Sequence, residues 1–401
     1  MYCQLDNLRR CMPSSIRKAL DELPVTLDGT YERILQGIPK QKSHHARRLF
    51  QCMVAAIRPL RVEELAEVLA IDFGPNVEAN LIEDWRPTNP DDAVLSTCST
   101  LIAIIEDRSS KIVQFSHFSV KEFLTADRLQ FSDVGNIREF YVLLEPAHTI
   151  LALACLSVLL QLDESVDKRR QVSTFPLAFY AAQHWFDHAK FEDVALGIQA
   201  PMERLFNPKE PFFRAWICLQ DTPPRDQTID RLVQYPPAPW KTPLYYAVIH
   251  DFSRLLKHLI VMHGQDINVT LGPMRGLLHE ASRHGHFKAA RVLLDHGARV
   301  NIRDFMNWTP LHFASYQGHA KALQLLLEHG GDLNAQTTLR ETALFLASKY
   351  GHLEVVRLLL DHGADMKIKG GDHDLVPFQV AAKHRHHDIV QLLLEPGSER
   401  E

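Results

Sequence analysis

At 401 residues, with 46% hydrophobic and 23% charged residues, the chain has an ordinary globular composition and enough length for two or three domains. Its formal net charge of −5 gives no electrostatic reason to expect nucleic acid or an anionic membrane as a partner. Its six cysteines are scattered without a Cys-x-x-Cys pair, which fits a reducing compartment better than a disulfide framework.

The first residues and the longest apolar run bear on the expected localisation. No basic region and apolar run follow Met1, so no signal peptide is predicted. The longest apolar run, residues 150–160, is too short to span a bilayer. We therefore expect a cytoplasmic protein without a membrane partner, and the nucleus remains the alternative.

The first 128 residues predict short helices followed by a β-hairpin. Apolar residues recur at helical spacing over residues 31–38, 49–57 and 62–69, and Pro59 ends the second of these stretches. A fourth helix is expected from Asp92 to about Leu101. Residues 102–105 and 112–115 then read as two strands joined by a polar turn. Helices followed by a two-stranded wing make a winged-helix fold.

The wing is followed by a further helix start. Ser119 and Glu122 have the spacing of a capping box, and Phe118 and Phe123 stand where a hydrophobic staple would lie. The next segment, residues 129–238, is expected to form a helical bridge domain. The fold class is therefore mainly α up to this point, with a winged-helix domain over residues 1–128.

From residue 239 onward one pattern occurs five times. Its starts lie at residues 242, 276, 309, 342 and 376, with spacings of 34, 33, 33 and 34 residues, and read TPLY, GLLH, TPLH, TALF and VPFQ. An alanine follows each start by five positions. A period near 33 with such starts resembles ankyrin repeats, which implies a solenoid that binds proteins.

The residues of a single repeat support this resemblance physically. Thr309 suits a helix N-cap and Pro310 the first helical position, while Gly318 suits a left-handed turn between the helices. The first and last repeats deviate, because Asp251 and Arg385 replace the glycine at that turn.

The order of motifs resembles fungal NACHT–ankyrin proteins of the STAND type. LPVTLDGTYERI (23–34), RPLRVEEL (58–65) and HFSVKEFL (117–124) are similar to the winged helix after the ATPase core, a domain also described in GPI inositol-deacylase-like sequences. FPLAFYAA (175–182) and Trp185 resemble the helical bridge that follows it. The resemblance implies the ligand-recognition and regulatory part of a signalling protein.

The chain departs from that family at the nucleotide site. It contains no GxxxxGK[ST] loop, and MYCQLD (1–6) resembles the last stretch of the nucleotide-binding module. A natural paralogue without the ATPase and a truncated gene model would give the same sequence. No GxSxG, HExxH or paired-carboxylate motif is present either, so we expect neither enzymatic activity nor a cofactor.

His117 is the residue of the first half with a possible ligand role. In related signalling NTPases a winged-helix histidine senses the phosphate of ADP, and the resemblance places His117 at that position. The alternative is a histidine that fixes the corner between the last strand and the next helix. Without a phosphate-binding loop in this chain, His117 would be at most a relic of a nucleotide sensor.

The alternative function is DNA binding by the winged helix, with the ankyrin repeats binding a partner. The helix expected from Asp92 would be the recognition helix, but it opens with two aspartates and contains no Lys or Arg. Phosphate contacts supply much of the affinity in protein–DNA interfaces, so nucleic acid is not the expected partner.

The repeats are the expected partner-binding surface. The hairpin tips before the first helices and the exposed faces of those helices carry aromatic residues, Met and Arg, which are typical interface anchors. The candidate residues for protein binding are Phe305, Met306, Trp308, Tyr316, Leu339, Arg340 and Tyr350. The alternative is that Trp308 and the tyrosines pack along the groove only for stability.

Two further expectations concern the histidines and the C-terminus. Sixteen of the 22 histidines lie at or after His250, but they occupy repeat positions and lack zinc-ligand spacing, so we expect no metal site. The last helix, residues 388–395, is as apolar as its interior counterpart at 354–361. We therefore expect an uncapped fifth repeat, over residues 376–395, that frays or self-associates.

Overall fold

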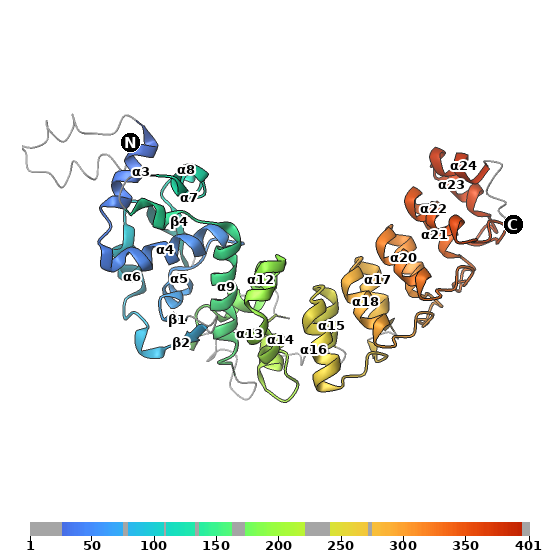
Figure 1. Ribbon diagram of the computed structural model, residues 1–401, viewed down its shortest axis with the longest axis horizontal. Coiled ribbons are helices and arrows are strands. Elements are labelled where there is room, and N and C mark those ends of the chain that lie inside the picture. Colours follow the sequence, from blue (N-terminus) through green and yellow to red (C-terminus); the bar gives the residue numbers. More distant parts are fainter. Residues whose placement is uncertain are drawn as a thin grey trace, which may run out of the picture. The chain divides into compact units, whose positions relative to one another are not determined.

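The computed structural model describes residues 26–74, 79–107, 110–132, 136–162, 173–220, 241–271 and 275–394. The chain divides into two compact units, residues 1–236 and 237–401. Both units are mainly helical, as predicted (Figure 1). The expected remnant of a nucleotide-binding module at residues 1–6 lies outside the described residues.

The first unit contains the winged helix and the bridge. Its α-helices are α3 (Leu27–Gln36), α4 (Lys40–Ala55), α5 (Val62–Val68), α6 (Pro90–Cys98), α7 (Phe118–Leu124), α8 (Asp127–Gln130), α9 (Leu144–Leu159), α11 (Ala178–His188), α12 (Glu192–Gly197), α13 (Gln199–Leu205) and α14 (Phe212–Gln220). The short 3₁₀ helices are η2 (Glu83–Trp85) and η3 (Ile137–Phe140), and the strands are β1 (Ile71–Phe73), β2 (Ala79–Leu81), β3 (Ile102–Asp107) and β4 (Ser110–Phe115).

The wing is the antiparallel pair β3–β4, with a register from Ile102↔Phe115 to Asp107↔Ser110. Both strands are longer than predicted, because residues 106, 107, 110 and 111 continue the ladder instead of forming the turn. The amide of Val113 also donates to the carbonyl of Leu60, which joins the wing to the start of α5. A second antiparallel hairpin, β1–β2, lies between α5 and α6, and the sequence pattern did not predict it.

The start of α7 differs from the predicted capping box. The N-cap is His117, whose Nδ1 accepts from the amide of Ser119, and Ser119 itself lies inside the helix. The hydroxyl of Ser119 instead contacts the hydroxyl of Tyr31 at 2.8 Å. Phe118 is 73% exposed while Phe123 is buried, so no hydrophobic staple forms between them.

The bridge is joined to the winged helix by buried polar contacts. Glu67 on α5 accepts from the amide of Leu177 at 2.7 Å and pairs with Arg86 at 2.8 Å. The amide of Ile57, just after α4, donates to the hydroxyl of Tyr180 on α11. Helix α9 packs on both α4 and α11. Residues 1–128 and 129–238 were predicted as separate domains, and their separation stays a prediction.

Tyr180 also belongs to a buried chain of polar side chains between α9 and α11. Its hydroxyl lies 3.0 Å from Nε2 of His188, and Nδ1 of His188 lies 2.8 Å from Nδ1 of His148. Burial lowers the pKa of His188 to about 3, and it lowers the pKa of His148 as well. Both imidazoles are therefore neutral at pH 7.

The C-terminal helices of the first unit enclose an aromatic cluster. The indole of Trp216 on α14 lies 5.6 Å from that of Trp185, 5.4 Å from the ring of Phe206 and 5.6 Å from the ring of Phe213, measured between centroids. Its Nε1 donates to the carbonyl of Ala182 at 3.0 Å. Trp185, predicted as part of the bridge, is fully buried there.

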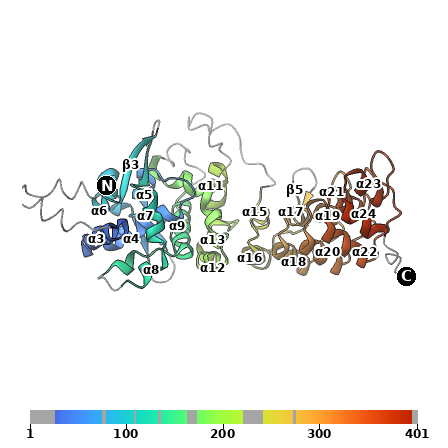
Figure 2. The same cartoon turned by 90° about the horizontal axis from the view of Figure 1, so that it is seen from above.

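The described part of the second unit contains five helix pairs that stack in sequence order (Figures 1 and 2). They are α15 (Pro243–Ile249) and α16 (Ser253–His263), α17 (Leu277–His284) and α18 (Phe287–Asp295), α19 (Pro310–Gln317) and α20 (Ala320–Glu328), α21 (Ala343–Tyr350) and α22 (Leu353–Asp361), and α23 (Pro377–Lys383) and α24 (His387–Leu394). A two-stranded ladder, β5 (Thr270–Leu271) and β6 (Arg275–Gly276), precedes α17.

Histidines connect consecutive repeats. The Nε2 atoms of His286, His319, His352 and His386 donate to the carbonyls of Ile249, Arg283, Tyr316 and Lys349, each in the preceding repeat. A second set caps the first helices: His312 Nδ1 accepts from the amide of Thr309, and its Nε2 donates to the carbonyls of Ala335 and Glu341. These five histidines therefore serve as hydrogen-bonding groups at recurring repeat positions.

The glycine between the paired helices is required by the next histidine. Gly318 has φ +78°, and a Cβ atom built there would lie 2.5 Å from Nδ1 of His352. A Cβ atom at Gly285 would approach the ring of His319 in the same way, and one at Gly351 would approach the ring of His386. Asp251 takes this position in the first repeat with φ 55°, and its carboxylate accepts from the amide of Ala289.

We expect Gly318→Ala to lower the free energy of unfolding more than Gly330→Ala. Gly330 has φ +81°, but a Cβ atom at this position would have no other atom within 4 Å, so alanine there meets only the backbone penalty of about 1 kcal/mol. Alanine at 318 must also displace the His352 ring, for about 1–2 kcal/mol more. Chemical denaturation of both variants measures the difference, and equal losses would contradict the steric role of His352.

The last repeat has an open outer face. Val356 on α22 is fully buried, whereas its counterpart Val390 on α24 is only half-buried. Leu394 is 61% exposed, and Phe378 on α23 is also exposed. The tail beyond Leu394 lies outside the described residues. Fraying and self-association at this end stay predictions.

Candidate functional site

An open groove of about 470 Å³ lies on the face of the first helices, at the second and third repeats. Its walls come from β6, α17, the hairpin tip before α19, and α19 itself. The lining residues are Arg275, Arg283, Asp304, Phe305, Met306, Trp308, Phe313, Tyr316 and Gln317. Four of the seven residues predicted to bind a partner therefore lie together here: Phe305, Met306, Trp308 and Tyr316.

Asp304 builds the hairpin tip that carries the aromatic residues. Its buried carboxylate accepts from the amides of Met306 at 2.9 Å and Trp308 at 2.8 Å. Its own amide donates to the carbonyl of Trp308. Asn307 then adopts φ 58°, which an asparagine tolerates better than most residues. The tip is thus held in one shape, and Phe305 is left exposed at its end.

The aromatic side chains form a continuous row. The Trp308 ring lies 4.9 Å from that of Phe313 and 5.6 Å from that of Tyr316. The Tyr316 ring meets that of Tyr350 in the next repeat at 4.5 Å, edge to face. Trp308 and Tyr316 remain half-buried, so they both pack along the groove and present surface to it. The two alternative roles considered for them are therefore compatible.

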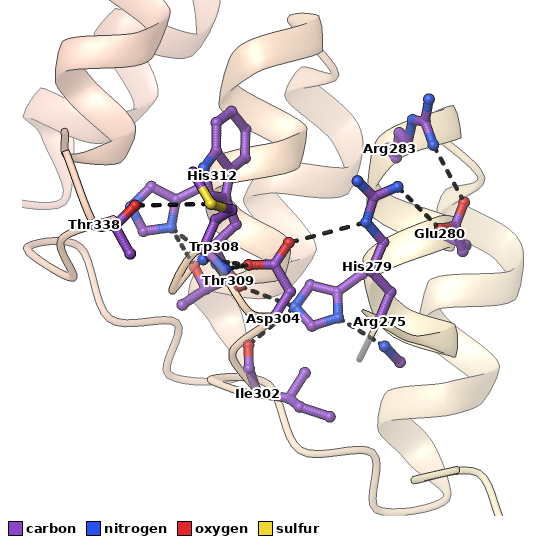
Figure 3. Close-up of polar contacts among 12 residues, drawn as sticks. Arg275, His279, Glu280, Arg283, Ile302, Asp304, Trp308, Thr309, His312 and Thr338 are labelled. Atoms are coloured by element: carbon purple, nitrogen blue, oxygen red, sulfur yellow. Dashed lines mark hydrogen bonds and ion pairs between the residues drawn. The ribbon is translucent and has the colours of Figure 1, made fainter. Parts of the chain in front are cut away.

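Charged groups border this row. Figure 3 shows Arg275 between two carboxylates, with its nitrogens 3.8 Å from Glu280 and 3.9 Å from Asp304. Its guanidinium also lies over the ring of Phe313, at 5.3 Å from the centroid. Arg283 and His284 approach Glu280 from the other side, at 3.9 and 3.6 Å. Burial acts to raise the pKa of Glu280, but His284, Arg283 and Arg275 together bring it below the ordinary value.

The other predicted partner-binding residues lie one repeat further along. Leu339 and Arg340 form the tip before α21, and Arg340 pairs with Asp374 of the following tip. Arg340 has φ 60°, the same left-handed turn as Asn307. Leu339 and Tyr350 are exposed. These residues do not line the groove at Trp308, although the ring of Tyr350 extends its aromatic row.

The predictions missed Arg275, Glu280, Arg283 and Asp304. A signal for two of them was present, since Arg275 immediately precedes its repeat start, as Trp308 does, and Arg283 has the repeat position of Tyr316. Glu280 had a signal of another kind, because Arg283 and His284 follow it at the helical spacings of three and four residues. Asp304 had none, because only the folded hairpin brings it near Arg275.

The remaining candidates of the first unit show structural roles. His117 caps α7 and its ring lies 4.3 Å from that of Phe118, which is the corner-fixing arrangement; nucleotide sensing stays a prediction. Ser96 on α6 and Ser99 just after it are exposed, while Thr97 is buried and donates to the carbonyl of Ala93. The described part of the chain shows no group of three or more His, Cys, Asp or Glu placed to hold a metal ion. None of its helices is long and apolar enough to cross a membrane.

Comparisons with known proteins identify parts of both units. Residues 244–337 and 329–400 match the family model for ankyrin repeats, and residues 31–134 match the model for the winged helix domain of GPI inositol-deacylase. The chain is 30% identical over 296 residues to azaphilone pigments biosynthesis cluster protein L of Monascus ruber. That alignment covers 70% of this chain and 61% of the relative, so the chain spans less than two thirds of the relative's length.

Proposed function

We propose that the chain is the recognition and regulatory part of a NACHT-type signalling protein. In this proposal the ankyrin groove binds a protein, and the winged-helix unit transmits that event to an ATPase module in another part of the assembly. The match to ankyrin repeats supports protein binding, and the match to the winged helix domain is consistent with the NACHT family. We also propose that the chain itself is not an enzyme, since its sequence has no phosphate-binding loop.

The observation that best supports protein binding is the row of aromatic side chains in the groove. Trp308 and Tyr316 present half-buried rings beside the exposed Phe305, on a hairpin tip that Asp304 holds rigid. Rigid aromatic anchors lose little conformational entropy on binding and commonly dominate the binding energy of an interface. The DNA-binding alternative has less support, because α6 carries Asp91, Asp92 and Ser96 outside its buried face and no basic residue.

We expect the combined change Trp308→Ala and Tyr316→Ala to abolish capture of at least one partner by the immobilised chain from extracts of its source cells. Arg340→Ala is expected to lower the affinity for the same partner by about tenfold at most. An exposed charge at the rim of an interface contributes less to the binding energy than a buried aromatic ring. Quantitative mass spectrometry of the captured proteins gives the readout.

Phe131→Ala provides the matched control, because Phe131 is an exposed aromatic residue of the first unit. It should leave capture unchanged. Circular dichroism must show that the repeats of the Trp308 and Tyr316 variant remain folded. Retention of every partner by that folded variant would place recognition on another surface.

A further inference from the structure

One position of each repeat forms a row along the groove face. The carbonyls of Ile249, Arg283, Tyr316 and Lys349 accept from the histidine of the following repeat, so these residues occupy equivalent places on their first helices. Lys383 is the equivalent residue of the last repeat, seven positions after its start. The row therefore places cationic side chains on both sides of Tyr316.

The carboxylates near this row are buried behind the cations. The side chains of Glu280, Asp304 and Glu341 are 10%, 2% and 4% exposed. Those of Arg283 and Lys349 are 45% and 30% exposed, and Lys383 is exposed as well. Asp372 is an exposed acidic residue near Lys349. At the second and third repeats the accessible charges of the groove are thus those of the arginines, while the carboxylates that offset them lie behind.

The guanidinium of Arg275 has hydrogen-bonding capacity to spare. Its distances to Glu280 and Asp304, 3.8 and 3.9 Å, are ion-pair distances but too long for hydrogen bonds. Its buried Nε has no hydrogen-bond partner among the described residues. Arg283 also stands 3.9 Å from Glu280. The Nε atom is itself out of reach of a ligand, but the side chains of Arg275 and Arg283 are 27% and 45% exposed. A ligand oxygen that accepts from their accessible nitrogens would gain charge-assisted hydrogen bonds without breaking existing ones.

We propose that the groove selects an acidic protein segment, in which an Asp or Glu stands next to an aromatic or large aliphatic residue. The carboxylate accepts from Arg275 and Arg283, and the apolar side chain packs against Trp308 and Tyr316. This inference rests on the proposed protein-binding function and adds the chemistry of the partner.

A nucleic acid fits the same row less well. Binding to a phosphate backbone depends on several uncompensated cations that release counterions. Here Arg275 and Arg283 share the buried carboxylates Glu280 and Asp304, and Lys349 is hydrogen-bonded to Glu341 at 2.9 Å. One carboxylate of a peptide satisfies the open donors, whereas a string of phosphates would lack enough free positive charge.

A random dodecapeptide library displayed on phage tests the proposal on the full chain. Peptides enriched on the immobilised chain are expected to carry an acidic residue within two positions of an aromatic, Leu or Ile residue. Synthetic copies of the best binders should lose about tenfold or more in affinity for Arg275→Gln and for Arg283→Gln, the effect of removing one charge-assisted hydrogen bond. Affinity should also fall as the salt concentration rises from about 50 to about 300 mM.

Arg291→Gln is the matched control, since Arg291 is an exposed arginine on the second helix of the same repeat. It should bind the peptides as the unchanged chain does. Enriched peptides without acidic residues, or equal binding by the Arg275 and Arg283 variants, would overturn the acidic preference while protein binding stands. Failure to enrich any peptide would count against both proposals, and tighter binding of a 20-nucleotide single-stranded DNA than of the peptides would favour the nucleic-acid alternative.

Discussion

Trp216→Ala should destabilise the first unit by about 4 kcal/mol, which is typical of removing a fully buried tryptophan. The indole is in contact with three other aromatic rings, and its Nε1 satisfies the carbonyl of Ala182. Alanine would leave a cavity in the middle of this cluster. Hydrogen exchange followed by mass spectrometry can measure the loss separately for peptides of residues 173–220 and of residues 276–394.

Trp216→Phe is the companion variant. It keeps most of the aromatic packing and loses the hydrogen bond, so a smaller loss of about 1–2 kcal/mol is expected. Exchange in the ankyrin unit should not change in either variant. A loss below about 1 kcal/mol for Trp216→Ala would mean that the cluster contributes little to the stability of this unit.

Acid should destabilise the ankyrin unit through His312. Burial lowers the pKa of His312 in the folded chain to about 4, against 6.5 in the unfolded chain. Between those two values the unfolded chain takes up a proton that the folded chain does not. The free energy of unfolding therefore falls as the pH drops from 6.5 to 4, by about 3 kcal/mol in all, and this contribution changes no further below pH 4.

His312→Gln should remove that contribution. Glutamine can accept from the amide at the helix start, as Gln379 does from Val376 in the last repeat, but it does not titrate. We expect a loss of about 2 kcal/mol at pH 7 and little difference from the unchanged chain at pH 4, measured by hydrogen exchange of residues 309–350. His362→Gln is the control, because His362 is exposed and its Nδ1 donates to the carbonyl of Leu358 in the helix that it follows. The same unfolding free energy at pH 7 and pH 4.5 in the unchanged chain would contradict this assignment.

The repeats were predictable because their constraints are local and recur. A threonine or glycine at four of the five starts, an alanine five positions later and a glycine at three of the five turns each satisfy a requirement of backbone or packing within one repeat or between neighbours. The wing was predictable for a similar reason, since two short runs rich in isoleucine and valine flank a polar segment. The start of α7 was not, because Ser119 has a partner 88 residues away, Tyr31, which no local pattern contains.

The candidate site was predicted in its aromatic half only. Trp308 and Tyr316 were recognisable as large residues at repeat positions that face the groove. The charged half depends on distances between side chains of different repeats, such as Arg275 to Asp304. Asp304 itself reads in the sequence as an ordinary turn residue. Its role in holding the hairpin tip is seen only in the folded chain, where its carboxylate accepts hydrogen bonds from two backbone amides.

The buried polar chain from Ile57 to His148 has only one arrangement of protons that satisfies it. The Tyr180 oxygen accepts from the amide of Ile57, and its own proton finds an acceptor among the described neighbours at Nε2 of His188. His188 must then carry its proton on Nδ1 and donate it to Nδ1 of His148, whose own proton lies on Nε2. The tautomers of two histidines are thereby dictated by the hydroxyl of Tyr180. Its oxygen can accept more than one hydrogen bond but has a single proton to donate, so the acceptor of that proton sets the direction of both later bonds.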